Sequence, residues 1–418
     1  SGIWEYFNAG MQVGELYKFA ITTDTGKILY KADPFAFSAE YRPGTASVTA
    51  DISGFSWNDG DWISKRSQAD MTKQPISIYE VHLGSWKKKD REEKDGYYTY
   101  VEAAHELAAY VKEMGYTHVE LMGIAEHPYD GSWGYQVTGY FAPTSRYGSP
   151  KDFMYFVNYL HKNGIGVILD WVPAHFPKDA HGLADFDGHP LFEYEDPRKG
   201  EHPDWGTKVF DYGKNEVKDF LISNALYWVE EYHVDGLRVD AVASMLYLDY
   251  GRAPGEWIPN LYGENENLDA VAFFKQLKKV LIKEKCPAVL IAQDSSTWGR
   301  VTGSHEDALG FDFKWNHGWK NDFDKFMQSD PLFRKGVYQK LTDNMLYFYS
   351  EFFIQELHIT EQELPGSNDG EKHANMRLAT AYQYCYPGKK RTAENCTGTL
   401  PQSFMEALNA FYKEHPAL

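Results

Sequence analysis

From residue 76 onward, the chain alternates short apolar runs, typical of buried strands, with longer runs of helical periodicity. The apolar runs are Ile76–His82, His118–Met122, Gly166–Asp170, Val234–Val239 and Ala288–Ala292. The helical runs lie between them at residues 100–114, 150–163, 217–232 and 268–285. This alternation predicts βα units and a parallel sheet. The dense repetition favours an α/β fold of the (β/α)8 TIM-barrel type over an open doubly wound sheet, and no glycine-rich phosphate-binding motif follows a strand.

The pattern loosens after about residue 300. Leu309–Trp315 and Met345–Leu357 are predicted as two further strands, and Gln402–Tyr412 as a last helix. An eighth strand is hard to find. The segment Gly388–Gly398 is polar and rich in turn residues, whereas buried barrel strands are usually apolar, so we do not expect it to be a barrel strand.

The first 70 residues have a different character. Two alternating runs, Leu16–Ile21 and Lys27–Tyr30, flank the turn Asp24-Thr-Gly26. We therefore expect a small β-sandwich-like module at residues 1–70 and the barrel at residues 71–418. The abrupt start at Ser1-Gly-Ile-Trp-Glu suggests that this module is truncated at its N-terminus.

Composition excludes several classes of protein. The chain has 42 basic and 60 acidic residues, a net charge of −18, which argues against nucleic acid or an anionic membrane as partner. No apolar run reaches the length of a membrane span. Three cysteines without a CxxC motif indicate neither a zinc site nor a disulfide framework and, with no leader, favour a cytoplasmic location. The aromatic content of 16% suits sugar stacking, although an aromatic-rich core explains it equally well.

The segment Tyr232–Asp240 contains the strongest single candidate for chemistry. Asp240 follows the predicted strand Val234–Val239, and the carboxyl ends of barrel strands are where barrel enzymes hold their reactive groups. Arg238 lies two residues earlier, so both side chains emerge on the same side of the strand. Such a cation keeps a carboxylate ionised, as a nucleophile requires, although an ordinary structural Asp–Arg pair has the same spacing.

Four segments are similar, nearly residue by residue, to the 1,4-α-glucan (glycogen) branching enzymes of the α-amylase superfamily, glycoside hydrolase family 13. They are Tyr79–Trp86, Trp133–Tyr140, Asp235–Tyr250 and Leu309–Asn316. The resemblance covers residues 1 to about 350 and the last helix. It implies a carbohydrate-binding-module-like first domain, a catalytic-type barrel without the family's C-terminal β domain, and no cofactor or metal.

The resemblance also implies an activity. The family cleaves an α-1,4 linkage in a glucan such as glycogen or amylose and passes the fragment to a 6-hydroxyl as an α-1,6 branch. This retaining double displacement needs a carboxylate nucleophile and a protonated carboxyl about 5 Å apart.

Carried over by motif, Asp240 is the nucleophile and Arg238 the arginine beside it. Asp170 and His175 match the contacts to sugar hydroxyls, and Tyr135 matches the ring that stacks under the reacting sugar. A buried core histidine and a core aromatic remain alternative interpretations of His175 and Tyr135. For Trp133 and Trp298, a sugar-binding wall and core packing are equally compatible with the sequence.

Three departures from the family bear on turnover. Gln293 occupies the slot of the acid/base glutamate, and an amide cannot donate and recover a proton at neutral pH. Asp294 is adjacent but should point away, because side chains alternate along a strand. The second departure follows the seventh strand: His358 matches the family's histidine, but Ile359 stands where the transition-state-stabilising aspartate belongs. The missing eighth strand is the third departure.

Glu356 or Glu361 would replace that aspartate only with a shift of register. The sequence therefore favours a branching-enzyme homologue with severely impaired turnover. The main alternative is a non-catalytic α-glucan-binding protein. A hydrolase of the same superfamily is disfavoured by the branching-type segments Tyr79–Trp86 and Asp235–Tyr250.

Overall fold

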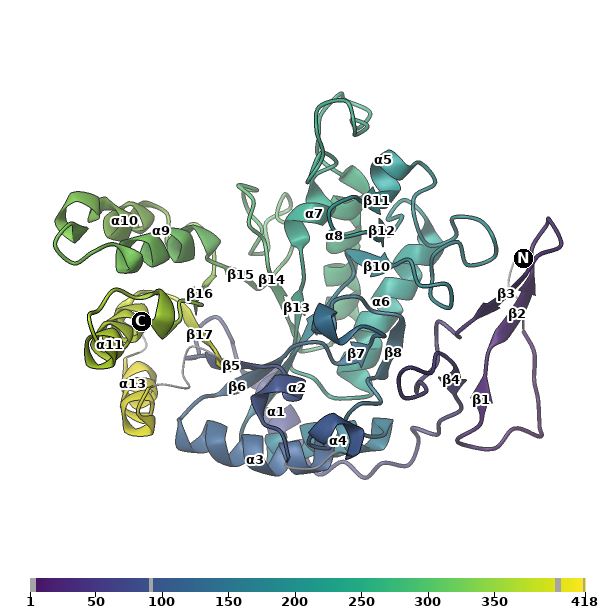
Figure 1. Ribbon diagram of the computed structural model, residues 1–418, viewed down its shortest axis with the longest axis horizontal. Coiled ribbons are helices and arrows are strands. Elements are labelled where there is room, and N and C mark those ends of the chain that lie inside the picture. The colour runs from purple at the N-terminus through teal and green to yellow at the C-terminus, as the bar shows by residue number, and fades with distance from the viewer. Residues whose placement is uncertain (1–4, 90–92, 395–399, 416–417) are drawn as a thin grey trace.

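A computed structural model describes residues 5–89, 93–394, 400–415 and 418. Eight parallel strands form a closed barrel, and each strand is hydrogen-bonded to the barrel strand that follows it in the chain, which confirms the predicted (β/α)8 architecture (Figure 1). The barrel strands are β5 Ser77–Val81, β6 His118–Leu121, β9 Gly166–Trp171, β13 Gly236–Val239, β14 Val289–Ala292, β15 Phe313–Trp315, β16 Phe353–Leu357 and β17 Lys389–Ala393.

The barrel is closed by β17, which pairs with β16 on one side and β5 on the other. The prediction that residues 388–398 form no barrel strand was therefore wrong for residues 389–393, while residues 395–398 lie outside the described part. Arg391 points into the barrel, where its guanidinium forms ion pairs with Glu80 and, at 2.9 Å, with Glu120. The polar side chain of this strand is thus neutralised by partners on β5 and β6.

The longer helices pack around the outside of the barrel (Figure 1). They are α3 Tyr100–Glu113, α4 Pro150–Lys162, α6 Asn215–Glu230, α8 Leu268–Lys283, α9 His317–Gln328, α11 Asp369–Cys385 and α13 Gln402–Glu414. Reciprocal side-chain caps fix the starts of two of them: Thr99 with Glu102 before α3, and Ser149 with Asp152 before α4. The helices predicted between the first five strands, and the last helix, are confirmed.

Two apolar cores hold the barrel together. The larger lies between the strands and the surrounding helices. The smaller lies inside the barrel and consists of Ile76, Ile78, Ile168, Val289, Ile291, Phe313, Trp315 and Ile354. Charged residues also occupy the barrel interior, among them Glu80, Glu120, Arg238, Glu356 and Arg391, all of which are buried.

Residues 5–70 contain two two-stranded antiparallel sheets. In one, β1 Leu16–Tyr17 pairs with β4 Ser47–Val48, and in the other β2 Phe19–Thr22 pairs with β3 Ile28–Lys31. The predicted hairpin is thus present, and it projects from one side of the molecule (right in Figure 1). The short helix α1 Gly60–Gln68 follows. A sandwich-like carbohydrate-binding module at residues 1–70 stays a prediction.

The remaining elements are short. Near the carboxyl ends of the barrel strands lie β7 Ala125–Glu126, β8 Gly139–Pro143, β10 His175–Pro177, α5 Pro197–Gly200, β11 Glu201–His202, β12 Thr207–Val209 and α7 Val242–Leu246 (Figure 1). Further single turns are α2 Leu83–Trp86, α10 Gln339–Thr342 and the 3-10 segments 93–96, 130–132, 334–337, 343–346 and 361–363. Among the described residues, no helix combines the length and apolar composition that crossing a membrane requires.

Candidate active site

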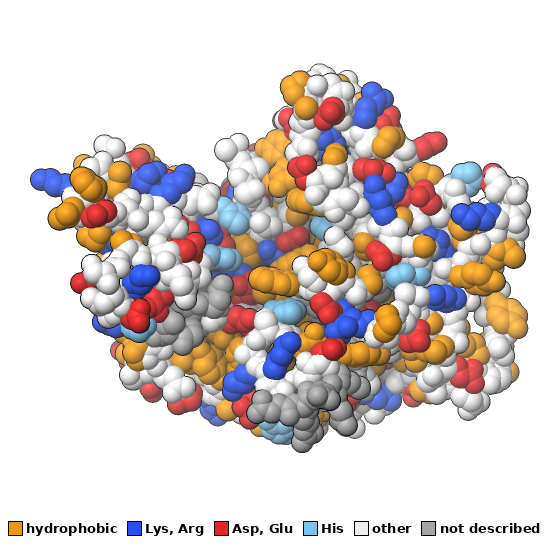
Figure 2. Space-filling view, in the orientation of Figure 1, with side chains coloured by type: hydrophobic (Ala, Val, Ile, Leu, Met, Phe, Trp, Pro, Cys, Tyr) orange, Lys and Arg blue, Asp and Glu red, His pale blue; other side chains and the backbone are white. Residues whose placement is uncertain are grey.

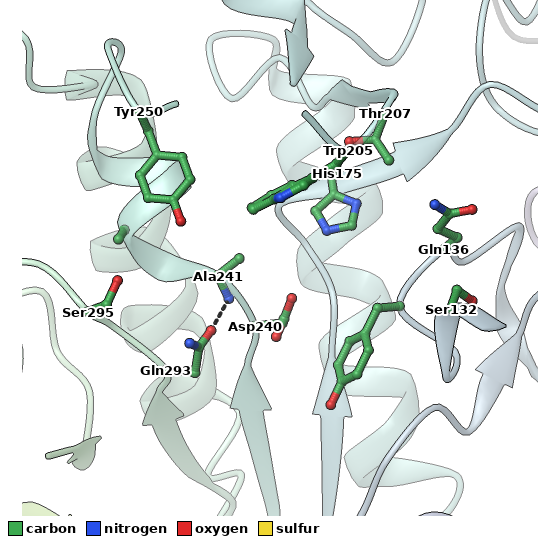
Figure 3. Close-up of a pocket in the computed structure, with 12 residues that line it drawn as sticks. Ser132, Gln136, His175, Trp205, Thr207, Asp240, Ala241, Tyr250, Gln293 and Ser295 are labelled. Atoms are coloured by element: carbon green, nitrogen blue, oxygen red, sulfur yellow. Dashed lines mark hydrogen bonds between the residues drawn. The ribbon is translucent and has the colours of Figure 1, made fainter. Parts of the chain in front are cut away.

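A cleft of about 400 Å³ opens at the carboxyl end of the barrel strands. The molecule is hollowed on this side, between the lobe formed by α9 and α10 and the loops around α7, and charged side chains lie in the hollow (Figure 2). The lining residues are Ser132, Tyr135, Gln136, His175, Trp205, Thr207, Asp240, Ala241, Ala243, Tyr250, Gln293 and Ser295 (Figure 3).

Asp240 lies at the rim because the chain turns sharply directly after β13. Ala241 has a left-handed backbone conformation with φ of 53°, and α7 begins at the next residue. The Asp240 backbone N–H donates to the Trp171 carbonyl at 2.9 Å, which fixes the position of the turn on β9. The carboxylate accepts a hydrogen bond of 2.6 Å from Arg238 and keeps 15% of its side-chain surface exposed to the cleft.

Arg238 connects Asp240 to a second predicted residue. Its guanidinium lies 3.3 Å from the Asp170 carboxylate as well as 2.6 Å from Asp240. The Tyr135 hydroxyl donates a hydrogen bond to the same Asp170 oxygen that faces Arg238. The fold therefore brings four predicted site residues, from β9, from β13 and its following turn, and from the loop before β8, into one bonded group.

Burial governs the protonation of this group. It raises the pKa of the Tyr135 hydroxyl well above its ordinary value, so the phenol stays a neutral donor. It also raises the pKa of Asp170; the positive charge of Arg238 opposes this, and the carboxylates of Glu120 and Glu80 reinforce it. The carboxyl oxygen Asp170 Oδ1 is buried without a hydrogen-bond partner, and Asp170 lies beneath the residues that line the cleft.

Gln293 lies beside this group, at the end of the neighbouring strand β14. Its amide oxygen accepts a hydrogen bond of 2.7 Å from the Ala241 N–H (Figure 3). Its amide nitrogen lies 3.2 Å from His317 Nε2. His317 Nδ1 in turn pairs with Glu356 at 2.8 Å. Asp294 points away from the cleft, as the strand alternation predicted, and forms a buried ion pair of 2.8 Å with Lys314.

His175 reaches the cleft from β10. It is 5% exposed, and its ring lies 5.1 Å from the Trp205 indole, centre to centre. Burial lowers the pKa of His175, so the imidazole is neutral at pH 7 and offers one donor and one acceptor.

His358 does not line the cleft. Its Nε2 atom contacts Arg391 and lies 3.3 Å from Glu356. Burial alone would raise the pKa of Glu356, but hydrogen bonds from His317 and His358 lower it well below its ordinary value. Both histidines therefore stabilise the ionised form of a buried carboxylate.

At position 359, where the family has its transition-state-stabilising aspartate, this chain has no carboxylate. Ile359 is 1% exposed and packs in the outer apolar core. Glu361 pairs with His373 at 2.9 Å, and Glu356 is held inside the barrel. Neither glutamate lines the cleft.

Sequence reasoning missed several lining residues, of which Trp205, Thr207 and Tyr250 are the most prominent. Trp133 and Trp298, weighed as sugar-binding walls, do not line the cleft. In the sequence, Asp204-Trp-Gly206 sets an aromatic residue beside a glycine, which is typical of turns. This pattern could have indicated Trp205, but no comparable pattern indicates Thr207 or Tyr250.

One group of carboxylates among the described residues has the spacing of a metal site. Oxygens of Glu80, Glu120 and Asp170 lie within 4.8 Å of one another inside the barrel. Arg391 pairs with the first two and Arg238 with the third. Because two guanidinium groups already neutralise this cluster, we assign no metal ion to it.

Comparisons with known proteins agree with the geometry. The family model described as "Alpha amylase, catalytic domain" matches residues 105–196. The alpha-amylase from Geobacillus thermoleovorans has a similar fold, with a TM-score of 0.62 at 17% identity, covering 84% of this chain and 80% of that one.

Relatives of much higher identity are 1,4-alpha-glucan branching enzymes GlgB. The Butyrivibrio fibrisolvens enzyme is 55% identical over 399 residues, 93% of this chain and 62% of the relative. The Protochlamydia amoebophila enzyme is 49% identical over 451 residues, 100% of this chain and 62% of the relative. The chain thus spans less than two thirds of the length of these relatives. On this identity and the barrel that carries its motifs, the chain belongs to the 1,4-alpha-glucan branching enzyme family of the α-amylase superfamily.

Proposed function

We propose that this chain binds an α-1,4-glucan in the cleft and carries out branching-enzyme chemistry with severely reduced turnover. In this chemistry an α-1,4 linkage is cleaved and the fragment is transferred to a 6-hydroxyl as an α-1,6 branch. The observation that carries the proposal is Asp240. Its carboxylate is held at 2.6 Å by Arg238 at the carboxyl end of β13 and opens onto the cleft that Gln293 also lines.

In the proposed first step, Asp240 attacks the anomeric carbon, a glycosyl ester forms, and the bond to the leaving sugar oxygen breaks. Arg238 holds the carboxylate in position with a hydrogen bond of 2.6 Å. Tyr135, Asp170 and His175 hold the ring and hydroxyls of the reacting sugar. In the second step a 6-hydroxyl displaces Asp240, which leaves with its electron pair.

Both steps move a proton that Gln293 is unable to supply or remove. The leaving oxygen must gain a proton and the attacking 6-hydroxyl must lose one, whereas an amide does neither at neutral pH. Loss of a positioned acid/base group lowers rates by roughly 10²- to 10⁴-fold. His358 remains a predicted sugar contact, and residues 1–70 remain a proposed carbohydrate-binding-module-like unit.

The test restores the missing acid. A glutamate at position 293 keeps one oxygen on the Ala241 N–H and places the other beside His317, where the amide nitrogen now lies. We expect Gln293→Glu to raise branching at least about a hundredfold, measured as falling iodine absorbance of amylose without new reducing ends. The control is the double variant Asp240→Asn/Gln293→Glu, which should show no activity. A rate unchanged by Gln293→Glu would contradict the proposal that the amide limits turnover.

The second candidate is a non-catalytic α-glucan-binding protein. Two observations favour it: a neutral amide at position 293, and buried Ile359 where an aspartate would stabilise the transition state. This candidate predicts that amylose retards the protein in a gel while iodine absorbance and reducing ends stay constant, even in Gln293→Glu. New reducing ends would instead indicate a hydrolase.

A further inference from the structure

The three-stranded sheet that overhangs the cleft presents an aromatic side chain from its turn. In this sheet β12 lies between β10 and β11, and Trp205 sits in the turn that joins β11 to β12. The Gly206 N–H donates to the His202 carbonyl at 2.9 Å, and Gly206 has φ of 66°, a conformation that favours glycine. The turn therefore fixes the direction in which the indole points.

The indole is accessible although aromatic rings surround it. Trp205 is 37% exposed, while its ring centre lies 4.6 Å from His202, 5.1 Å from His175 and 5.8 Å from Tyr250. Figure 3 shows it above Asp240, on the side toward His175. Tyr135 enters the cleft from a different loop, before β8.

Three buried polar atoms around Trp205 have no hydrogen-bond partner: His175 Nδ1, His202 Nε2 and Thr207 Oγ1. Their residues are only 5%, 3% and 1% exposed, and they come from β10, β11 and β12 respectively. Of these residues, His175 and Thr207 also line the cleft beside the exposed indole, and their unbonded polar atoms give that side of the cleft hydrogen-bonding capacity for a ligand with several hydroxyl groups.

The two imidazoles suit a neutral ligand. Burial, helped by the neighbouring His175 and Arg252, lowers the pKa of His202 to about 3, and burial also lowers that of His175. Neutral rings each offer one donor and one acceptor, which matches sugar hydroxyls. An indole face stacks on the apolar face of a glucose ring.

We propose that Trp205, with Thr207, forms a second glucose-binding position next to the one at Asp240, while His202 packs against the indole and holds it in place. The inference rests on the proposed function, because it assumes that the cleft binds α-glucan. It deepens that function: the cleft holds the reacting glucose through Asp240 and Tyr135, and a further glucose of the same chain on Trp205. Chains of several units therefore bind more tightly than a single sugar.

The first test measures maltoheptaose binding by titration calorimetry on the full chain, in which Gln293 limits turnover. We expect Trp205→Ala to weaken binding about tenfold or more, and Trp205→Phe, which keeps a stacking ring, to weaken it less. Tyr349→Ala is the matched control, since Tyr349 is 86% exposed and does not line the cleft; its affinity should equal that of the parent.

The outcomes separate the two proposals. If the parent binds maltoheptaose and Trp205→Ala binds equally well, the second glucose position is wrong and the proposed function stands. If the parent binds no maltoheptaose at millimolar concentration, both are wrong.

The second test uses Thr207→Val, which replaces the unbonded hydroxyl with a methyl group of similar size. Because the unliganded protein loses no hydrogen bond, its melting temperature should stay the same or rise. The affinity for maltoheptaose should fall roughly three- to tenfold. A lower melting temperature with unchanged affinity would show that the hydroxyl is structural and would overturn its assignment to the sugar.

Discussion

Two aspartates bracket strand β13, and their surroundings differ. Asp235, at the amino end, is 2% exposed and accepts hydrogen bonds from Trp62 and Arg66, each at 2.8 Å, from His161 at 2.9 Å and from the Val167 N–H at 2.6 Å. Asp240, at the carboxyl end, accepts a hydrogen bond from Arg238 and has surface exposed to the cleft.

The difference separates a structural carboxylate from a functional one. At the amino end, donors from α1, α4 and β9 saturate Asp235, so that it ties α1 to the base of the barrel. At the carboxyl end, Asp240 keeps oxygen lone pairs for a ligand. The same residue type at the two ends of one strand thus has opposite tasks.

The largest expected effect comes from Asp235→Asn. This change keeps the shape but leaves the buried Arg66 charge without its carboxylate partner and leaves His161 with Asp59 as its remaining carboxylate partner. We expect a loss of about 3–5 kcal/mol in the free energy of unfolding, measured by urea denaturation. A loss below about 1 kcal/mol would show that solvent or neighbouring groups compensate, and the contrast between the two aspartates would not hold.

An intermediate effect should follow the protonation of His161, which lies between two carboxylates. Its Nδ1 is 2.8 Å from Asp59 and its Nε2 is 2.9 Å from Asp235, and Arg66, His118 and His233 are the other charged or titratable groups nearby. Burial alone would lower the pKa of His161, but Asp235 and Asp59 outweigh it and raise the pKa above its ordinary value of 6.5.

Because the folded-state pKa is raised, this stabilisation is complete below about pH 6.5 and is lost as the pH rises through the folded-state value. Asp59 and Asp235, whose pKa values are lowered, stay ionised throughout this window. We expect His161→Gln to cost roughly 2–3 kcal/mol at pH 6 and progressively less above neutrality. His189→Gln, on the surface beside Asp24, is the control. A cost independent of pH from 6 to 9 would contradict a charged His161.

The smallest effect on stability should come from Asp240→Asn, the same substitution at the other end of the strand. Arg238 keeps Asp170 as a partner, so no buried charge is left alone, and we expect a change within about 1 kcal/mol. In the same variant, the covalent adduct with an activated fluorosugar should disappear from the mass spectrum. An adduct that survives would assign the nucleophile to another residue.

Much of the fold is predictable from local patterns. The first five barrel strands, the helices between them and the position of Asp240 at a strand end follow from apolar periodicity and turn residues, which act over a few residues. β17 does not follow, because its polarity is compensated by Glu80 and Glu120, about 270 to 310 residues away along the chain. A local pattern has no access to such a partner.

The site divides in the same way. The barrel, the Asp240–Arg238 pair and the amide at position 293 are predictable from the amino-acid sequence, since each depends on residue identity and on the alternation of side chains along a strand. The folded arrangement was needed to see that Asp235 is saturated while Asp240 is available, and that His175, His202 and Thr207 surround Trp205. The physical reason is that hydrogen-bond partners are chosen by proximity in space, and the donors and acceptors that decide these roles come from different strands and helices.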